Sequence, residues 1–191
     1  MKVYKHNRTQ VRNIIECYER AGPETAREGR DWYRQAFMQA QEWADAIQST
    51  TAKIAQVISV LSPSVQWETN LRDAEKLIFA TPEERRKMKV STYGPNKDKA
   101  IGILEGWREF SFTGYNLKTY NFYHCIWNPY NETAVTIDRH ANAVATGKKG
   151  TRITTRMYGI AAASYREAAH RLNLRPLELQ AITWLQHLNE K

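Results

Sequence analysis

The sequence predicts an all-α protein, and three observations lead to that prediction. Apolar residues recur every three or four positions along most of the 191 residues, which is the period of a helix with one buried face. No segment alternates apolar and polar residues in the manner of a half-buried strand, and no repeat period is present. Proline, glycine and hydroxyl residues interrupt the helical pattern where helices would begin and end.

Local signals indicate where the individual helices begin and end. The segment 52–61 is apolar on most sides, which is typical of a buried helix, although its β-branched residues leave a strand possible. Thr81 at the N-cap, Pro82 at the first position and Glu84 at the third begin a short helix. Pro176 begins the last helix. In chain order, helices are expected over residues 11–18, 31–47, 52–61, 67–79, a short stretch after 81, 97–107, 119–126, a stretch after 138, 158–172 and 177–188.

Residues that end helices or favour turns are expected to separate these helices. Ala-Gly-Pro at 21–23 closes the first helix, and Ser-Thr-Thr at 49–51 closes the second. Ser-Pro-Ser at 62–64 ends the third, and the segment 91–96 has the composition of a turn. One domain over residues 1–191 is the expectation for a chain of this length.

Composition narrows the class of protein. A hydrophobic content of 42% with six tryptophans is enough for a real core and excludes a disordered chain. The net charge of +8 favours a polyanionic partner, most commonly nucleic acid, although a basic surface that only keeps the protein soluble is the alternative. Cys17 and Cys125 form neither a disulfide framework nor a metal-binding spacing. No membrane span or apolar leader is present, so that a cytoplasmic protein is expected.

The segment around Gly114 is the first candidate for function. Gly114 and Asn116 both tolerate a left-handed backbone, which would aim successive backbone N–H groups outward toward a phosphate. Lys118 and Thr119 follow at once and add a cation and a hydroxyl group. An ordinary helix–helix turn with a solvated lysine is the alternative interpretation.

Asp138 is the second candidate, twenty positions after Lys118. It stands where a helix N-cap is expected, a role worth about 1 kcal/mol. A carboxylate at the mouth of a cleft could instead act as a general base or stabilise a developing cation. A partly desolvated lysine near it could act as a nucleophile, because burial lowers the pKa of the amine.

These residues resemble the helix-hairpin-helix DNA glycosylase superfamily of the endonuclease III type. The family has a Gly-x-Gly-x-Lys hairpin followed by a Val-Asp-Thr-His segment, and this chain has Gly-Tyr-Asn-Leu-Lys at 114–118 and Ile-Asp-Arg-His at 137–140. Small phage-encoded relatives are more similar still: their Ser-Pro-x-x-x-Trp-Glu-x-Asn pattern occurs at 62–70 and their Gln-Ala-x-x-Trp pattern at 180–184. The resemblance implies a glycosylase-like core over residues 51–191, preceded by N-terminal helices at 1–50.

The resemblance also implies roles for single residues. Lys118 matches the family's Schiff-base lysine, Asp138 matches the aspartate that assists glycosidic-bond cleavage, and the residues from Gly114 to Thr119 match the phosphate-binding hairpin. Asn116 stands where the family has its second hairpin glycine, and the iron–sulfur cysteines are absent, as in many members. Neither a metal nor another cofactor is expected.

A glycosylase must extrude its target base from the duplex and hold it in a pocket. The candidates to line that pocket are Trp67, Asn70, Tyr123, Trp127 and His140. Basic residues between 148 and 175 would hold the DNA backbone, beginning with Lys148, Lys149 and Arg152, although a solvated surface is the alternative. Aromatic residues of this kind more often belong to the core, which is the alternative for each of them.

The favoured expectation is a monomeric enzyme that acts on a modified or damaged base in double-stranded DNA. If a bacteriophage encodes it, it would act in the cytoplasm of the host. The reaction would be hydrolysis of the N-glycosidic bond, with or without strand cleavage. Two alternatives stay open: a transferase on the same fold that builds hypermodified bases, and a DNA-binding module that has lost the chemistry.

Overall fold

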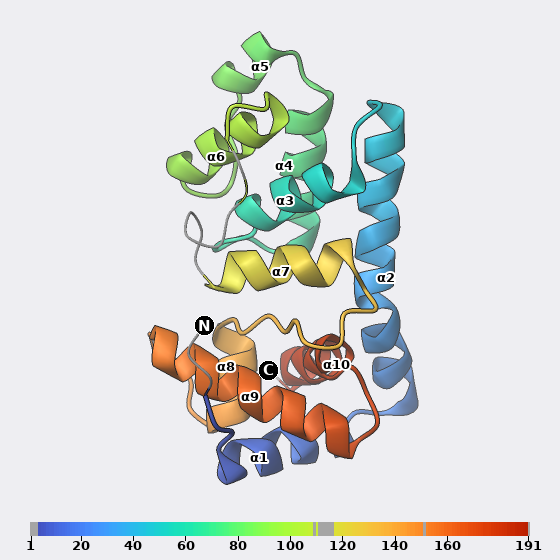
Figure 1. Ribbon diagram of the computed structural model, residues 1–191, viewed down its shortest axis with the longest axis vertical. Helices are drawn as coiled ribbons and strands as arrows, with labels where there is room; N and C mark the ends of the chain where they lie inside the picture. The colour runs from blue at the N-terminus through green and yellow to red at the C-terminus, as the bar shows by residue number, and fades with distance from the viewer. Residues whose placement is uncertain (1–3, 109, 111–116, 151, 191) are drawn as a thin grey trace. The chain divides into compact units, whose positions relative to one another are not determined.

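The computed structural model describes residues 4–108, 110, 117–150 and 152–190, and within them the prediction of an all-α fold is confirmed (Figure 1). No strand is found in these described residues. The helices are α1 (Arg8–Glu19), α2 (Pro23–Ala46), α3 (Thr51–Leu61), α4 (Trp67–Phe79), α5 (Pro82–Lys87), α6 (Gly94–Leu104), α7 (Leu117–Trp127), α8 (Arg139–Thr146), α9 (Thr155–Arg171) and α10 (Pro176–Asn189).

Polar side chains cap the starts of several helices, because the first turn of a helix has backbone N–H groups without an internal partner. Asn7 caps α1 by accepting a hydrogen bond from the backbone N–H of Gln10 at 3.1 Å. Thr81 and Glu84 form the expected capping box at α5, in which each side chain binds the backbone N–H of the other residue.

Two predicted helix starts are wrong. The second helix does not begin near Asp31: α2 begins at Pro23, the residue expected to close the preceding helix. Proline suits the first position of a helix because its missing N–H would have no partner there. For the same reason α6 begins at Gly94, with Pro95 in its first turn, inside the segment expected to be a turn.

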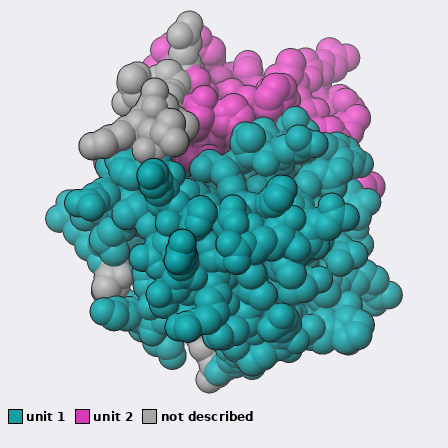
Figure 2. Space-filling model, turned by 60° about the horizontal axis from the view of Figure 1, so that its bottom comes forward, with its two compact units in different colours: residues 1–35, 128–191 teal, residues 36–127 magenta. Residues whose placement is uncertain are grey.

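The chain divides into two compact units, coloured teal and magenta in Figure 2. Unit 1 comprises residues 1–35 and 128–191, and unit 2 comprises residues 36–127. Helix α2 contributes its first half to unit 1 and its second half to unit 2. The expectation of a single domain over residues 1–191 stays a prediction.

Unit 1 is built around α1, which packs against α8, α9 and α10. The core of this unit includes Ile14 of α1, Tyr165 of α9 and Leu179 of α10, all fully buried. Tyr33, in the first half of α2, is also almost completely buried. Burial of these large side chains is the main favourable term for folding of the unit.

Unit 2 is built around α3, which packs against α4, α6 and α7. Every residue of α3 from Val57 to Leu61 is buried, as the apolar composition of this segment predicts. The short helix α5 packs on α6. Among the helices of the described residues, none is both long and apolar enough to cross a bilayer.

Candidate functional site

Asp138 caps helix α8, as its position in the sequence predicts. Its backbone is extended, and its side-chain Oδ1 accepts hydrogen bonds from the backbone N–H groups of His140 at 2.9 Å and Ala141 at 2.8 Å. Both N–H groups are in the first turn of α8, where backbone N–H groups have no partner within the helix. The side chain is half-buried, and no described residue donates a hydrogen bond to Oδ2.

The segment that leads into Asp138 is buried and held by a tyrosine. The hydroxyl group of Tyr158 donates to the backbone carbonyl of Val135 at 2.9 Å and accepts from the backbone N–H of Ile137 at 3.2 Å. Residues 134–137 are in an irregular stretch, so their backbone groups depend on such partners. Tyr158 therefore fixes the backbone immediately before the carboxylate.

Two further tyrosines form hydrogen bonds with side chains of α10. The hydroxyl group of Tyr33 contacts the side chains of Gln180 at 2.7 Å and Thr136 at 3.3 Å. The hydroxyl group of Tyr165 contacts that of Thr183 at 3.1 Å, and complete burial raises the pKa of Tyr165. The tyrosine therefore stays neutral and serves as a hydrogen-bonding group of the core.

Sequence reasoning missed these tyrosines as supports of the site. Tyr158 and Tyr165 are seven residues apart in α9 and therefore share one helix face, which is a signal that they line one surface. Nothing in the local sequence indicates that Tyr33 meets Thr136, because 103 positions separate them.

His140, expected in a base pocket, lies in the first turn of α8 and is half-buried. The centroid of its ring is 5.6 Å from that of His187 in α10, and the rings meet edge to face. The side-chain Nε of Arg139 lies 3.1 Å from Nε2 of His140 and donates to it. The base-pocket role of His140 stays a prediction.

The basic residues expected to hold DNA follow α8 in unit 1. Gly147 ends the helix with a left-handed backbone (φ 69°), which glycine adopts without steric strain. Lys148, Lys149 and Arg152 follow it, and all three are exposed. Lys148 lies ten positions after Asp138 and two positions after Thr146, the last residue of α8.

The predicted hairpin is only partly described. Gly114 and Asn116 lie outside the described residues, so that the phosphate-binding turn stays a prediction. Lys118 and Thr119 are in the first turn of α7, where Lys118 is half-buried and Thr119 is buried. Lys118 belongs to unit 2 and Asp138 belongs to unit 1, and their joint role in a reaction stays a prediction.

The remaining pocket candidates pack inside unit 2. Asn70 is only 1% exposed, and its side-chain Nδ2 donates to the backbone carbonyl of Ile58 at 3.2 Å, which joins α4 to α3. Trp67 meets Phe122 edge to face, with ring centroids 6.2 Å apart. Tyr123 is buried, which raises its pKa, and its ring lies nearly parallel to that of Trp127, with centroids 5.8 Å apart. Each side chain therefore has a packing role, and their role in a base pocket stays a prediction.

The described residues contain no group of three or more His, Cys, Asp or Glu side chains able to hold a metal ion. Comparisons with curated proteins and with solved structures gave no match. A family model, by contrast, matches residues 1–191. The match therefore takes in both compact units and every residue of the candidate site. The chain belongs to DUF7178, a family of unknown function.

Proposed function

We propose that the protein acts on a base in DNA, with Asp138 as the catalytic carboxylate and Lys118 as the nucleophile. The observation that carries the proposal is the state of the Asp138 side chain. Two backbone N–H groups hold Oδ1, while Oδ2 receives no hydrogen bond from any described residue. A carboxylate fixed at one oxygen and available at the other suits proton transfer or stabilisation of a positive charge.

The proposed reaction replaces the bond between the base and the sugar. The neutral amine of Lys118 attacks the anomeric carbon of the sugar, and the base departs with the electron pair of the glycosidic bond. Asp138 stabilises the positive charge that develops on the sugar and accepts the proton released by the attacking amine. Asp138 passes the proton it accepted to the departed base. Opening of the sugar ring then forms an imine between Lys118 and the sugar carbon, with the second amine proton transferred to the ring oxygen, and borohydride reduces this imine to a stable amine.

In this proposal the exposed cations that follow α8 bind the DNA backbone. Lys148, Lys149 and Arg152 would each neutralise a backbone phosphate and thereby release condensed counterions. Such contacts position a duplex without reading its sequence.

Borohydride trapping on duplexes that each carry one modified or mismatched base tests the mechanism. The wild-type protein should form a covalent complex with at least one duplex, and Lys118→Ala should form none. Lys118→Arg is the sharper variant, because it keeps the cation for a phosphate contact and cannot form an imine. Lys148→Ala is the matched control, which should bind DNA more weakly at a given salt concentration and still be trapped. Equal trapping of wild type and Lys118→Arg would refute the role of Lys118.

The capping role of Asp138 also favours a second candidate function, a DNA-binding module without catalysis. The two hydrogen bonds at Oδ1 account for Asp138 as a structural residue, with no chemistry required. Asp138→Asn separates the two candidates, because asparagine caps a helix as well as aspartate does and cannot accept a proton. The enzyme would lose base processing in this variant, whereas a binding module would keep its DNA affinity and show no product in either form. Mass spectrometry distinguishes a released free base, the glycosylase product, from a new nucleoside, the product of a transferase.

A further inference from the structure

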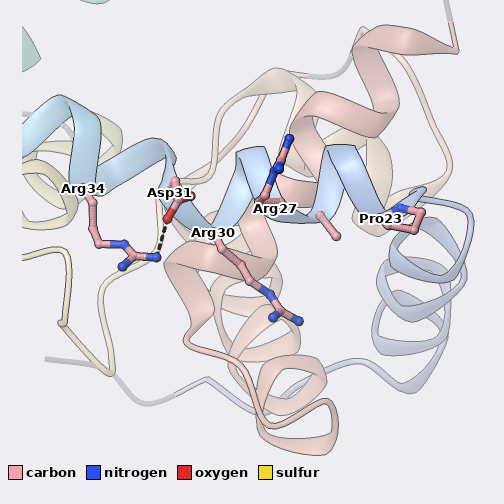
Figure 3. A pocket seen from close by; sticks show the side chains of 6 residues that line it. Pro23, Arg27, Arg30, Asp31 and Arg34 are labelled. Atoms are coloured by element: carbon pink, nitrogen blue, oxygen red, sulfur yellow. Dashed lines mark hydrogen bonds and ion pairs between the residues drawn. The ribbon is translucent and has the colours of Figure 1, made fainter.

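A row of arginines lies along one face of α2, away from the candidate site. Arg27, Arg30 and Arg34 are spaced by three and four residues, which places them on one side of a helix. They line a groove of about 350 Å³ together with Pro23, Ala26 and Asp31 (Figure 3). All of these residues belong to unit 1.

Packing on another face of α2 fixes the direction of this row. Gly29 lies against Ile182 of α10, so closely that an added Cβ would come within 2.6 Å of the Ile182 Cα. Tyr33, four residues further along, is buried and hydrogen-bonded to Gln180 of the same helix. Helix α10 therefore covers the face of α2 that carries Gly29 and Tyr33. The three arginines are on another face and are exposed.

Two of the arginines have charge available for a partner. Arg34 forms an ion pair with Asp31, shown as a dashed line in Figure 3. Within the described part of the chain, no acidic side chain forms an ion pair with Arg27 or Arg30. The groove also starts at Pro23, the first residue of a 24-residue helix, where the helix dipole is positive.

The shape of the groove favours an extended anion over a compact one. All six lining residues come from α2, so the lining includes no facing wall that would enclose a small molecule. Figure 3 shows the side chains of Arg27 and Arg30 extending in different directions from the helix. A single phosphate group would instead require donors that converge on one point.

We propose that this groove binds the phosphates of a DNA strand, as a second contact beyond the base-processing site. From Arg27 to Arg34 the helix rises about 10 Å at 1.5 Å per residue, which equals about three base-pair steps of about 3.4 Å along the axis of a duplex. The guanidinium group suits this role because its planar donors match the geometry of phosphate oxygens. The inference rests on the proposed action on DNA and adds a surface to it.

The test measures how the affinity for a duplex depends on salt, by fluorescence anisotropy with an unmodified labelled duplex. Each neutralised phosphate contributes about 0.9 to the slope of log affinity against log salt. Arg27→Gln with Arg30→Gln should therefore reduce the magnitude of that slope by about 1.8. Arg8→Gln with Arg72→Gln is the matched control, because both arginines are exposed, lie outside the groove and form no ion pair within the described part of the chain, and the double variant loses the same charge. Thermal melting verifies that both double variants fold.

The outcomes separate this inference from the proposed function. A slope reduced only in the groove variant supports the inference, even if borohydride trapping fails. An equal reduction in both double variants would show a net-charge effect and overturn the inference, as would an unchanged slope with intact trapping. A groove variant that keeps its duplex affinity and loses affinity for polyglutamate would assign the groove to an acidic protein, and that too overturns it. A wild-type protein without duplex binding overturns both proposals.

Discussion

Replacing Tyr158 with phenylalanine tests whether its hydroxyl group holds the segment that leads into Asp138. The hydroxyl group joins the backbone carbonyl of Val135 at 2.9 Å to the backbone N–H of Ile137 at 3.2 Å. The side chain is only 7% exposed, so water does not readily replace the lost partner. Phenylalanine keeps the ring and its packing, and the variant therefore removes the hydroxyl group together with these two hydrogen bonds.

The expected cost follows from those two bonds. A buried backbone group left without a partner costs about 1–3 kcal/mol, so that a carbonyl and an N–H together give a loss of about 3 kcal/mol. For a chain of this size, 1 kcal/mol corresponds to about 2–4 °C in Tm, which predicts a fall of about 6–12 °C. Base processing should also fall, because the backbone before Asp138 becomes free to shift.

Urea unfolding followed by circular dichroism measures the change, and Tyr130→Phe is the matched control. The side chain of Tyr130 is 59% exposed, so its substitution should change the free energy of unfolding by less than about 0.5 kcal/mol. If the two variants unfold at the same urea concentration, the proposed support of Asp138 by Tyr158 is refuted.

Three further predictions concern other parts of the structure. Gly29→Ala should lower the free energy of unfolding in urea by about 1–2 kcal/mol, because the added Cβ would approach the backbone of Ile182 to 2.6 Å and this clash outweighs the gain in helix propensity. Gly94→Ala is the control: an added Cβ there meets no atom within 4 Å, so the urea midpoint should stay the same or rise. Asp138→Ala should cost about 1 kcal/mol in urea unfolding while Asp138→Asn costs little, and equal losses would show that the cap is not the cause. Burial raises the pKa of Cys17 to about 11, so the thiol ionises more readily in the unfolded chain. The contribution of the protonated thiol to the free energy of unfolding should be complete below pH 9 and should be lost between pH 9 and 11. The Tm of a Cys17→Ala protein should therefore fall less than that of the wild type between pH 9 and 11.

Local chemistry made much of the helical framework predictable. The bounds of α4 agree with those expected from apolar spacing, and the capping box at Thr81 was readable because its two partners are three residues apart. Pro23 gave the wrong boundary because proline both ends helices and begins them, and only the neighbouring structure decides between the two.

In the candidate site, too, contacts between residues close in sequence could be predicted and contacts between distant residues could not. The role of Asp138 as a cap could be predicted, because a cap depends on the next few residues. The contact of Tyr33 with Gln180 could not, because 147 positions separate the two residues and only the packing of α2 on α10 joins them. The arginine row on α2 was also missed, since it crosses the helix start that was wrongly placed near Asp31.

The discontinuous make-up of unit 1 has a consequence for synthesis on the ribosome. Helix α1 emerges early, yet the helices that bury it, α8, α9 and α10, all lie after residue 128. At about 5–20 residues per second, the 156 residues between positions 35 and 191 take roughly 8–30 s to make. Unit 2 is complete in the nascent chain before that interval ends. The apolar face of α1 is therefore exposed to chaperones while the rest of its core is still being translated.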